Sequence, residues 1–187
     1  MDAVKVCTVP SPSVPIVGGR VQVGLCNPVV NGDFRDRRGL VGTDQPGWFS
    51  GVPFGWSGRA AIYNVRQINE KHFANLHTLS REPPGPIFFQ QTVGNSCCAL
   101  VSLQFFVDNP YNNPLYGDYG LTYQILARGA LVASGVTTGI RNDPRTVRLE
   151  AQVQAGEPIT IAFRKNATNH AMGITDVVVK GVVRMPA

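Results

Sequence analysis

The stretch Asn31-Gly32-Asp33-Phe34 opens a series of short segments that alternate apolar and polar residues and continue towards the C-terminus. Asn-Gly fits a tight turn that needs positive φ, and Phe34 supplies an apolar plug for the end of a sandwich. Two aromatic corners follow, Gln45-Pro46-Gly47-Trp48 and Pro53-Phe54-Gly55-Trp56. A turn, a buried aromatic and a Pro/Gly/Trp corner are typical of the start of a β-sandwich.

The composition agrees with a β-rich domain. The chain has 187 residues, the size of one sandwich domain or of a domain with an arm. Its 43% hydrophobic content allows a sizeable core, whereas 20 glycines and 14 prolines indicate many turns and few helices. Charged residues make up only 16%, and the net charge of +5 is spread without a long basic run. We therefore predict no nucleic-acid partner.

The N-terminus has no signal-peptide layout, and no apolar stretch is long enough to span a membrane. We therefore expect synthesis in the cytoplasm and no membrane insertion. The four cysteines are Cys7, Cys26, Cys97 and Cys98, and none has the C-x-x-C spacing of a zinc site. Reduced cysteines are the expected state, with a Cys7–Cys26 disulfide as the alternative.

Residues 1–28 form a distinct segment that we predict to be an extended arm. The prolines of residues 10–15 favour an extended conformation, and the strand pattern of residues 20–25 follows them. The expected anchors are apolar residues, some of which add a strand to an open sheet edge. These assembly residues are Val14, Ile16, Val17, Val21 and Val23. Docking on a neighbouring subunit is the preferred interpretation, and folding back on the arm's own domain is the alternative.

Strand patterns recur at short intervals through residues 29–187, which we assign to one jelly-roll domain. The clearest covers residues 99–107, where Leu103 and Phe105 lie on the core face and Gln104 and Phe106 on the other. The one helix candidate, residues 65–71, has poor apolar spacing. The sequence therefore predicts an all-β protein, an antiparallel β-sandwich of the jelly-roll type with an extended N-terminal arm.

Three motifs together resemble the galactose-binding-like jelly rolls, a group that includes several carbohydrate-binding modules. They are the Asn31–Phe34 turn with its Pro-Gly-Trp corner, the strand 85–93 with its Gln-Thr pair, and the closing strand 173–179, where Asp176 precedes alternating valines. The resemblance covers roughly residues 29–183 and implies the jelly-roll fold and a glycan ligand.

The same resemblance implies a structural calcium ion, held partly by an acidic residue directly after the Asn-Gly-x-Phe aromatic. Here that residue is Arg35, whose charge opposes a dication. Asp36 and Asp176 remain as the calcium candidates. We therefore predict no cofactor, with calcium as the alternative.

Nothing in the sequence matches a known catalytic motif. There is no G-x-S-x-G elbow, H-E-x-x-H or phosphate-binding loop, and the acidic residues are scattered rather than paired as a glycosidase requires. His72 and His77 would lie on opposite faces of a strand, so they cannot chelate one metal ion together. We predict that the protein is not an enzyme.

Aromatic, amide and guanidinium side chains around the strand 99–107 are suited to sugars, which need stacking surfaces and hydrogen-bonding partners. The candidate glycan-binding residues, taken from this strand, its neighbours and the Tyr-rich loop, are Tyr63, Gln104, Phe106, Tyr111, Tyr116, Tyr119, Gln124 and Arg164. Trp48 and Trp56 are interpreted as corner packing, with sugar stacking as the alternative.

Two functions follow. The first is a noncatalytic structural or attachment subunit of a virion or another extracellular assembly, with other protein subunits as partners, and it is favoured by the arm. The second is a free-standing glycan-binding module, favoured by the resemblance. Because fold analogy is an associational argument, the sequence places the first slightly ahead.

Overall fold

The computed structural model describes residues 20–24, 29–42, 49–58, 62–68, 71–77, 88–95, 99–108, 119–139, 144–165 and 172–184. All regular secondary structure in these ranges is β-strand, which confirms the all-β prediction. No helix among these residues is long and apolar enough to cross a membrane. The four cysteines, Trp48, Tyr111 and Tyr116 lie outside the described residues.

Thirteen strands are described. They are β1 (Arg20–Gly24), β2 (Val41–Gly42), β3 (Phe49–Ser50), β4 (Ser57–Gly58), β5 (Ile62–Ile68), β6 (Lys71–His77), β7 (Phe88–Asn95), β8 (Leu100–Asp108), β9 (Tyr119–Ala127), β10 (Ala130–Gly139), β11 (Arg145–Gln152), β12 (Pro158–Lys165) and β13 (Met172–Arg184). The described residues of the one helix candidate, 65–68 and 71, lie in β5 and β6, in keeping with the poor helical spacing of this segment. Val65 lies in β5, where it pairs with Ala74 of β6, because these segments extend a sheet rather than bury a helical face.

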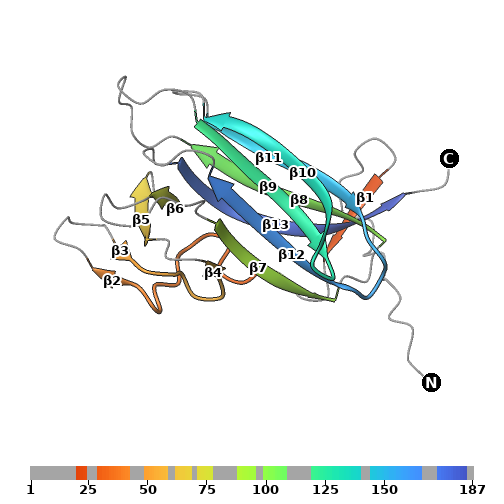
Figure 1. Cartoon of the computed structure of the whole chain (residues 1–187), viewed down its shortest axis with the longest axis horizontal. Helices are drawn as coiled ribbons and strands as arrows, with labels where there is room; N and C mark the ends of the chain where they lie inside the picture. The colour runs from red at the N-terminus through yellow and green to blue at the C-terminus, as the bar shows by residue number, and fades with distance from the viewer. Residues whose placement is uncertain are drawn as a thin grey trace.

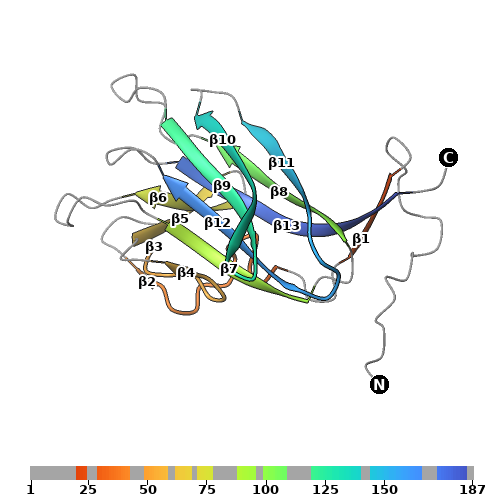
Figure 2. The ribbon, with the colours of Figure 1, turned by 45° about the vertical axis from the view of Figure 1, so that its right-hand side comes forward.

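The strands form two antiparallel layers (Figures 1 and 2). The six-stranded sheet has the order β11-β8-β13-β6-β5, with β1 added on β13, and the five-stranded sheet has the order β10-β9-β12-β7-β4. β2 and β3 form a separate two-stranded ribbon. Apart from the consecutive pairs β5–β6 and β9–β10, neighbours in the two large sheets come from distant parts of the chain, as in the predicted antiparallel β-sandwich.

Alternate residues of the long strands fill the space between the layers. Leu103 is fully buried and Phe105 is 1% exposed, which confirms the predicted register of β8. The Phe105 ring meets the edges of Tyr123 and Phe163 from the other sheet, with centroids 5.1 Å and 4.9 Å apart. Such edge-to-face pairs add to the burial of apolar area, so Phe105 joins the two layers.

The opening motif closes one end of this core. Phe34 is fully buried, and the buried Trp56 stacks on Phe89 with ring centroids 4.0 Å apart. The indole Nε1 of Trp56 donates a hydrogen bond to the carbonyl oxygen of Asn31 at 3.2 Å. Trp56 is therefore corner packing, the preferred interpretation of the sequence, and its ring does not face solvent.

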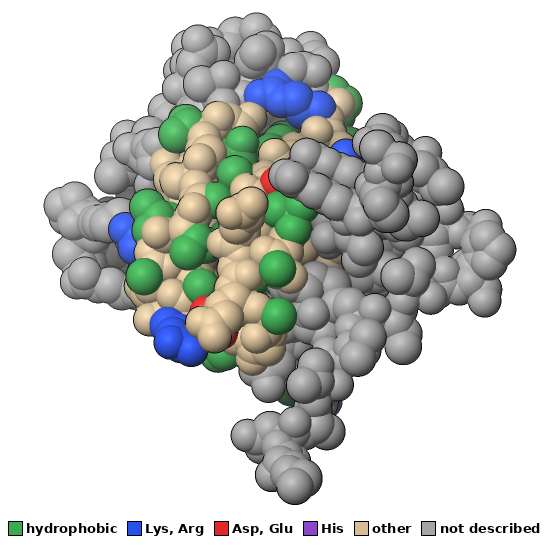
Figure 3. All heavy atoms as spheres, turned by 90° about the vertical axis from the view of Figure 1, so that its right-hand side faces the viewer, with side chains coloured by type: hydrophobic (Ala, Val, Ile, Leu, Met, Phe, Trp, Pro, Cys, Tyr) green, Lys and Arg blue, Asp and Glu red, His purple; other side chains and the backbone are tan. Residues whose placement is uncertain are grey.

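One side of the molecule carries few charged side chains among its described residues. Figure 3 shows the side at the right of Figure 1, where hydrophobic and uncharged atoms dominate the described part and charged side chains are sparse. Several exposed apolar side chains belong to β10, an edge strand of the five-stranded sheet. They are Leu131, Val132 and Val136, which are 56%, 41% and 62% exposed.

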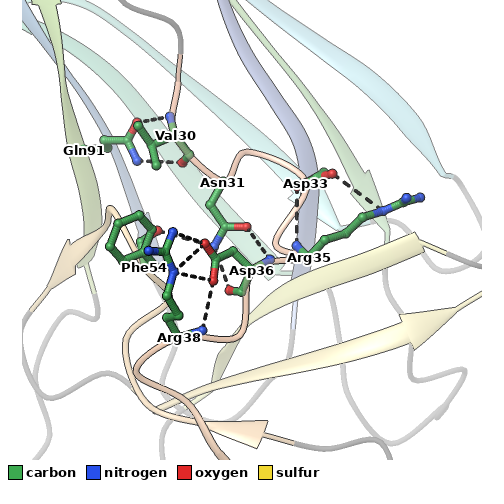
Figure 4. A network of polar contacts seen from close by, with 8 residues as sticks. All are labelled: Val30, Asn31, Asp33, Arg35, Asp36, Arg38, Phe54 and Gln91. Atoms are coloured by element: carbon green, nitrogen blue, oxygen red, sulfur yellow. Dashed lines mark hydrogen bonds and ion pairs between the residues drawn. The ribbon is translucent and has the colours of Figure 1, made fainter.

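The Gln91 side chain fastens the opening turn to β7. It is 5% exposed, and its Oε1 accepts from the amide of Val30 at 2.7 Å, while its Nε2 donates to the carbonyls of Val30 at 2.9 Å and Gly55 at 2.8 Å. Figure 4 shows the pair of bonds to Val30. The side-chain amide of Gln91 thus satisfies three backbone groups of two chain segments that do not pair with β7 as strands at these residues.

The described part of the arm, β1, pairs with β13 of its own chain. Val21 lies opposite Val183 and Val23 opposite Gly181. β1 thus adds a strand to a sheet edge of its own domain, which is the alternative that the sequence left open, and docking of the arm on a neighbouring subunit stays a prediction. β6 pairs with β13 only at residues 172–174, so the other end of this long strand has a free edge that β1 covers. Val14, Ile16 and Val17 lie outside the described residues.

Two candidate ligand-binding faces

The predicted glycan-binding residues fall on opposite outer faces of the sandwich. Gln104 and Phe106 alternate with the core residues of β8, so they point outwards from the six-stranded sheet. Gln124 of β9 and Arg164 of β12 point outwards from the five-stranded sheet by the same alternation. The expectation that these residues join Phe106 from neighbouring strands is wrong, because β8 is flanked by β11 and β13. For Tyr63 and Tyr119, the backbone places them in β5 and β9.

The outer face of the five-stranded sheet carries a row of neutral polar positions that crosses all five strands. In register order the row is Ser134, Gln124, Ala162, Gln90 and Ser57. Its two glutamines flank Ala162, which is only 2% exposed. We call these residues, together with Thr92, Thr160 and Arg164, the amide face.

A second row beside it continues the same chemistry. Thr160 lies opposite Thr92, and their Oγ1 atoms are 3.0 Å apart on the exposed side of the sheet. Arg164 is exposed and is the only charged residue among the described outward positions of β4, β7, β9, β10 and β12. Hydroxyl and amide groups both donate and accept hydrogen bonds, so this face is suited to a ligand rich in hydroxyl groups.

The outer face of the six-stranded sheet is built differently. The Phe106 ring lies 6.2 Å from that of Phe73, and the Lys71 ammonium lies 4.7 Å from the Phe106 centroid. On the neighbouring strands, Thr175 is the register partner of Phe106 and Arg148 that of Gln104. We call Lys71, Phe73, Ser102, Gln104, Phe106 and Thr175 the Phe106 face.

The centre of the Phe106 face is closed to solvent. Ser102 and Thr175 are fully buried and Phe73 is 2% exposed, although all three point away from the core between the sheets. Three polar atoms there are buried and have no hydrogen-bond partner among the described residues: Ser102 Oγ, Gln104 Nε2 and Thr175 Oγ1. Each such group carries a desolvation cost. Ser57, Thr92, Ser134 and Arg164 of the amide face are exposed around the buried Ala162, whereas a ligand cannot reach the unpartnered atoms of the Phe106 face without displacing what buries them.

The calcium candidates do not form a cation site. Asp36 accepts two hydrogen bonds from Nε of Arg38, at 3.0 Å and 2.9 Å, and the Arg38 guanidinium lowers the pKa of the Asp36 carboxyl. Asp176 is paired with Lys71 at 2.5 Å. Within the described part of the chain, no three His, Cys, Asp or Glu side chains gather around one point. These residues therefore do not fit a bound calcium ion.

A histidine lies beside the arginine-rich turn. His72 Nε2 is 3.5 Å from a guanidinium nitrogen of Arg37, and its Nδ1 is buried without a partner among the described residues. Burial lowers the pKa of His72, and the positive charges of Arg37 and Arg35 lower it further. Both effects favour the neutral imidazole of His72 over its charged form.

Sequence reasoning missed most of the amide face. Gln90, Thr92 and Thr160 lie at alternating outward positions of segments that were recognised as strands. Their common face became visible only through the pairing of β7 with β12. Polar residues at every second position of these strands were the available signal.

No family profile and no curated protein matches the sequence significantly. Solved structures do match. A cyclase from Fischerella sp. TAU, solved with 4-(1H-indol-3-yl)butan-2-one, has a TM-score of 0.62 at 11% identity, covering 89% of this chain and all of that one. A carbohydrate-binding module of family 4 has a TM-score of 0.54 at 17% identity, covering 81% of this chain and 97% of that one.

A third similar structure is part of a larger chain. The enzymatically active domain of tailspike protein 4 from bacteriophage CBA120 has a TM-score of 0.53 at 15% identity. The match covers 84% of this chain but only 21% of the tailspike chain. At these identities the similarity concerns the fold. The chain has the antiparallel jelly-roll fold seen in carbohydrate-binding modules.

Proposed function

We propose that this protein is a noncatalytic glycan-binding module and that the amide face holds the glycan. The observation that carries the proposal is the row from Ser134 through Gln124 and Gln90 to Ser57, which crosses five strands on the outer face of the sheet and has exposed residues at both ends. Strands lie about 4.8 Å apart, so the row spans about 19 Å, enough to contact several consecutive sugar units. The fold shared with carbohydrate-binding modules supports this choice.

The chemistry of the amide face favours a neutral chain. Its glutamines, serines and threonines match sugar hydroxyls in hydrogen bonding, and Leu131 and Val136 at the edge offer apolar surface for C–H groups. Arg164 adds one site for a carboxylate or a ring oxygen. The described outward positions of this sheet hold no carboxylate, so the acid and base of a glycosidase are not among them.

The test is a glycan array with the full chain, followed by calorimetric titration of the best ligand. Gln124→Ala and Gln90→Ala are each expected to weaken binding about 3- to 10-fold, because a neutral hydrogen bond contributes about 0.5–1.5 kcal/mol. Gln152→Ala is the matched control, since it removes an exposed glutamine from β11 in the other sheet.

A further variant in the same binding measurement distinguishes between the two faces as the ligand site. Phe106→Leu keeps an apolar side chain but removes the ring of the Phe106 face. If this variant loses binding while the Gln124 and Gln90 variants keep it, the ligand occupies the Phe106 face and the proposal is wrong. A folded protein that binds no glycan on the array would also end it.

A second candidate function is that of an attachment subunit in a virion or another extracellular assembly, with other protein subunits as partners. The similarity to part of a phage tailspike favours it. Glycan binding and assembly are compatible in one subunit. The test is to delete residues 1–19 and compare the masses of both proteins by native mass spectrometry. Loss of an oligomer in the truncated chain is expected, and an unchanged number of subunits would remove the arm from this function.

A further inference from the structure

The opening turn and the closing strand meet in backbone contact. The amide of Val177 donates to the carbonyl oxygen of Gly32 at 3.0 Å, and a side chain at Gly32 would place its Cβ 2.1 Å from the Val177 carbonyl oxygen. Asp176, directly before Val177 in β13, has a φ of 52° where a bulge interrupts the pairing of β13 with β8. The bulge turns the Asp176 carboxylate out of the alternation of the strand.

Each carboxylate around this contact already has a cation from the same chain. Asp33 pairs with Nε of Arg35 at 3.6 Å, Asp36 with Arg38, and Asp176 with Lys71 (Figure 4 shows the first two pairs). The three positive and three negative charges cancel. Arg37 in the same turn adds one further positive charge, so a divalent cation here would leave an excess of three and would have to break existing pairs.

Further contacts hold these cations in position. The Lys71 ammonium also faces the Phe106 ring, and the Arg38 guanidinium lies over the Phe54 ring, 3.6 Å from its centroid. The carboxylates are likewise constrained, since Asp36 also accepts from the backbone amide of Arg38. Lys71 and Arg38 are therefore held by cation–π contacts as well as by charge, and Asp36 also by a backbone hydrogen bond.

We propose that Lys71 and Arg35 take the place of the structural calcium ion that the resemblance to galactose-binding-like jelly rolls implies beside the opening turn. The Lys71 ammonium neutralises Asp176, and Arg35 neutralises Asp33 from the position where an acidic ligand is expected. The junction is then held by fixed internal charges, and the fold needs no divalent cation. This inference is independent of the proposed glycan binding.

The first test is thermal unfolding of the full chain in excess EDTA and in millimolar calcium chloride. The same midpoint in both solutions is expected. A midpoint that rises in calcium and falls in EDTA would overturn the inference, because the carboxylates would then hold calcium in solution.

The second test asks whether Arg35 and Lys71 are the cations that replace calcium. Arg35→Glu combined with Lys71→Met leaves Asp33, Asp176 and the new glutamate without these cations. Calcium is expected to raise the midpoint of this variant by about 5–10 °C at 100 times its dissociation constant. Arg128→Met is the control, because it frees Glu157 from an ion pair elsewhere and should give no calcium response. Lys71→Met alone, expected to respond more weakly, serves if the double variant does not fold. If the double variant and the Lys71→Met variant each unfold at the same temperature in EDTA and in calcium, the assignment of Lys71 and Arg35 as substitutes for calcium is overturned.

Discussion

The two outer faces of the sandwich differ in what surrounds their polar groups. On the amide face, Thr92 and Thr160 contact each other and remain accessible, so their remaining hydrogen-bonding capacity can be met by water or a ligand. On the Phe106 face, Ser102 and Thr175 are fully buried with hydroxyls that lack described partners. Residues of similar chemistry are therefore candidates for ligand contact on one sheet and carry a desolvation cost on the other. Accessibility, rather than the presence of an aromatic ring, distinguishes the better binding candidate.

The largest effect tests the core on which both faces depend. Phe105→Ala should lower the free energy of unfolding by about 3–5 kcal/mol, because it leaves a cavity between the two sheets. Phe106→Ala, one residue further along β8, should cost clearly less because Phe106 is only half-buried. Denaturant unfolding of both variants measures the difference. Equal losses would show that Phe106 does not lie on an outer face.

A smaller effect separates inward from outward amides on β7. Gln91→Ala leaves two carbonyls and one amide of the backbone without their side-chain partner, so it should cost about 1–3 kcal/mol. Gln90→Ala changes the adjacent residue on the amide face and should alter stability by less than about 0.5 kcal/mol. The same denaturant titration applies. If Gln90→Ala is the more damaging, the amide face has a structural role that the comparison does not include.

The burial of unpartnered hydroxyl groups on the Phe106 face can be tested with a substitution that should stabilise the protein. Thr175→Val replaces a buried hydroxyl that lacks a described partner with a methyl group of similar size, and should raise the unfolding free energy by about 1 kcal/mol. Thr92→Val makes the same change on the amide face, where an effect below about 0.5 kcal/mol is expected. A destabilised Thr175→Val variant would mean that the hydroxyl is hydrogen-bonded in solution.

The smallest effect concerns pH. The pKa of His72 is lowered in the folded state by burial and by Arg37 and Arg35, so the unfolded chain binds more protons just below the ordinary histidine pKa of about 6.5. Stability should therefore fall as pH decreases through that value and the folded-state pKa. His72→Gln should flatten this slope in melts between neutral and mildly acidic pH. An unchanged slope would assign the pH dependence to other groups.

The sequence predicted where the strands lie better than it predicted which strands pair with each other. Strict alternation in residues 99–107 determined both the strand and its core face, because one face had to be buried. The turn at Asn31 and the plug at Phe34 followed from local chemistry. The Gln91 bridge and the grouping of Gln124 with Gln90 depend on which strands pair across long loops. Alternation carries no information on that choice, so residues 99–107 and Gln124 were wrongly placed on one face.

The pairing of β1 with β13 has a mechanical consequence. Arg20 at the start of β1 lies opposite Arg184 at the end of β13, so the described chain enters and leaves the domain at one point. A force applied to both ends would load the hydrogen bonds of this ladder one after another, as in opening a zipper, rather than all at once in shear. β1 should therefore detach at low force while the β8–β13 pairing still holds, giving the domain a short extensible segment before its core is loaded.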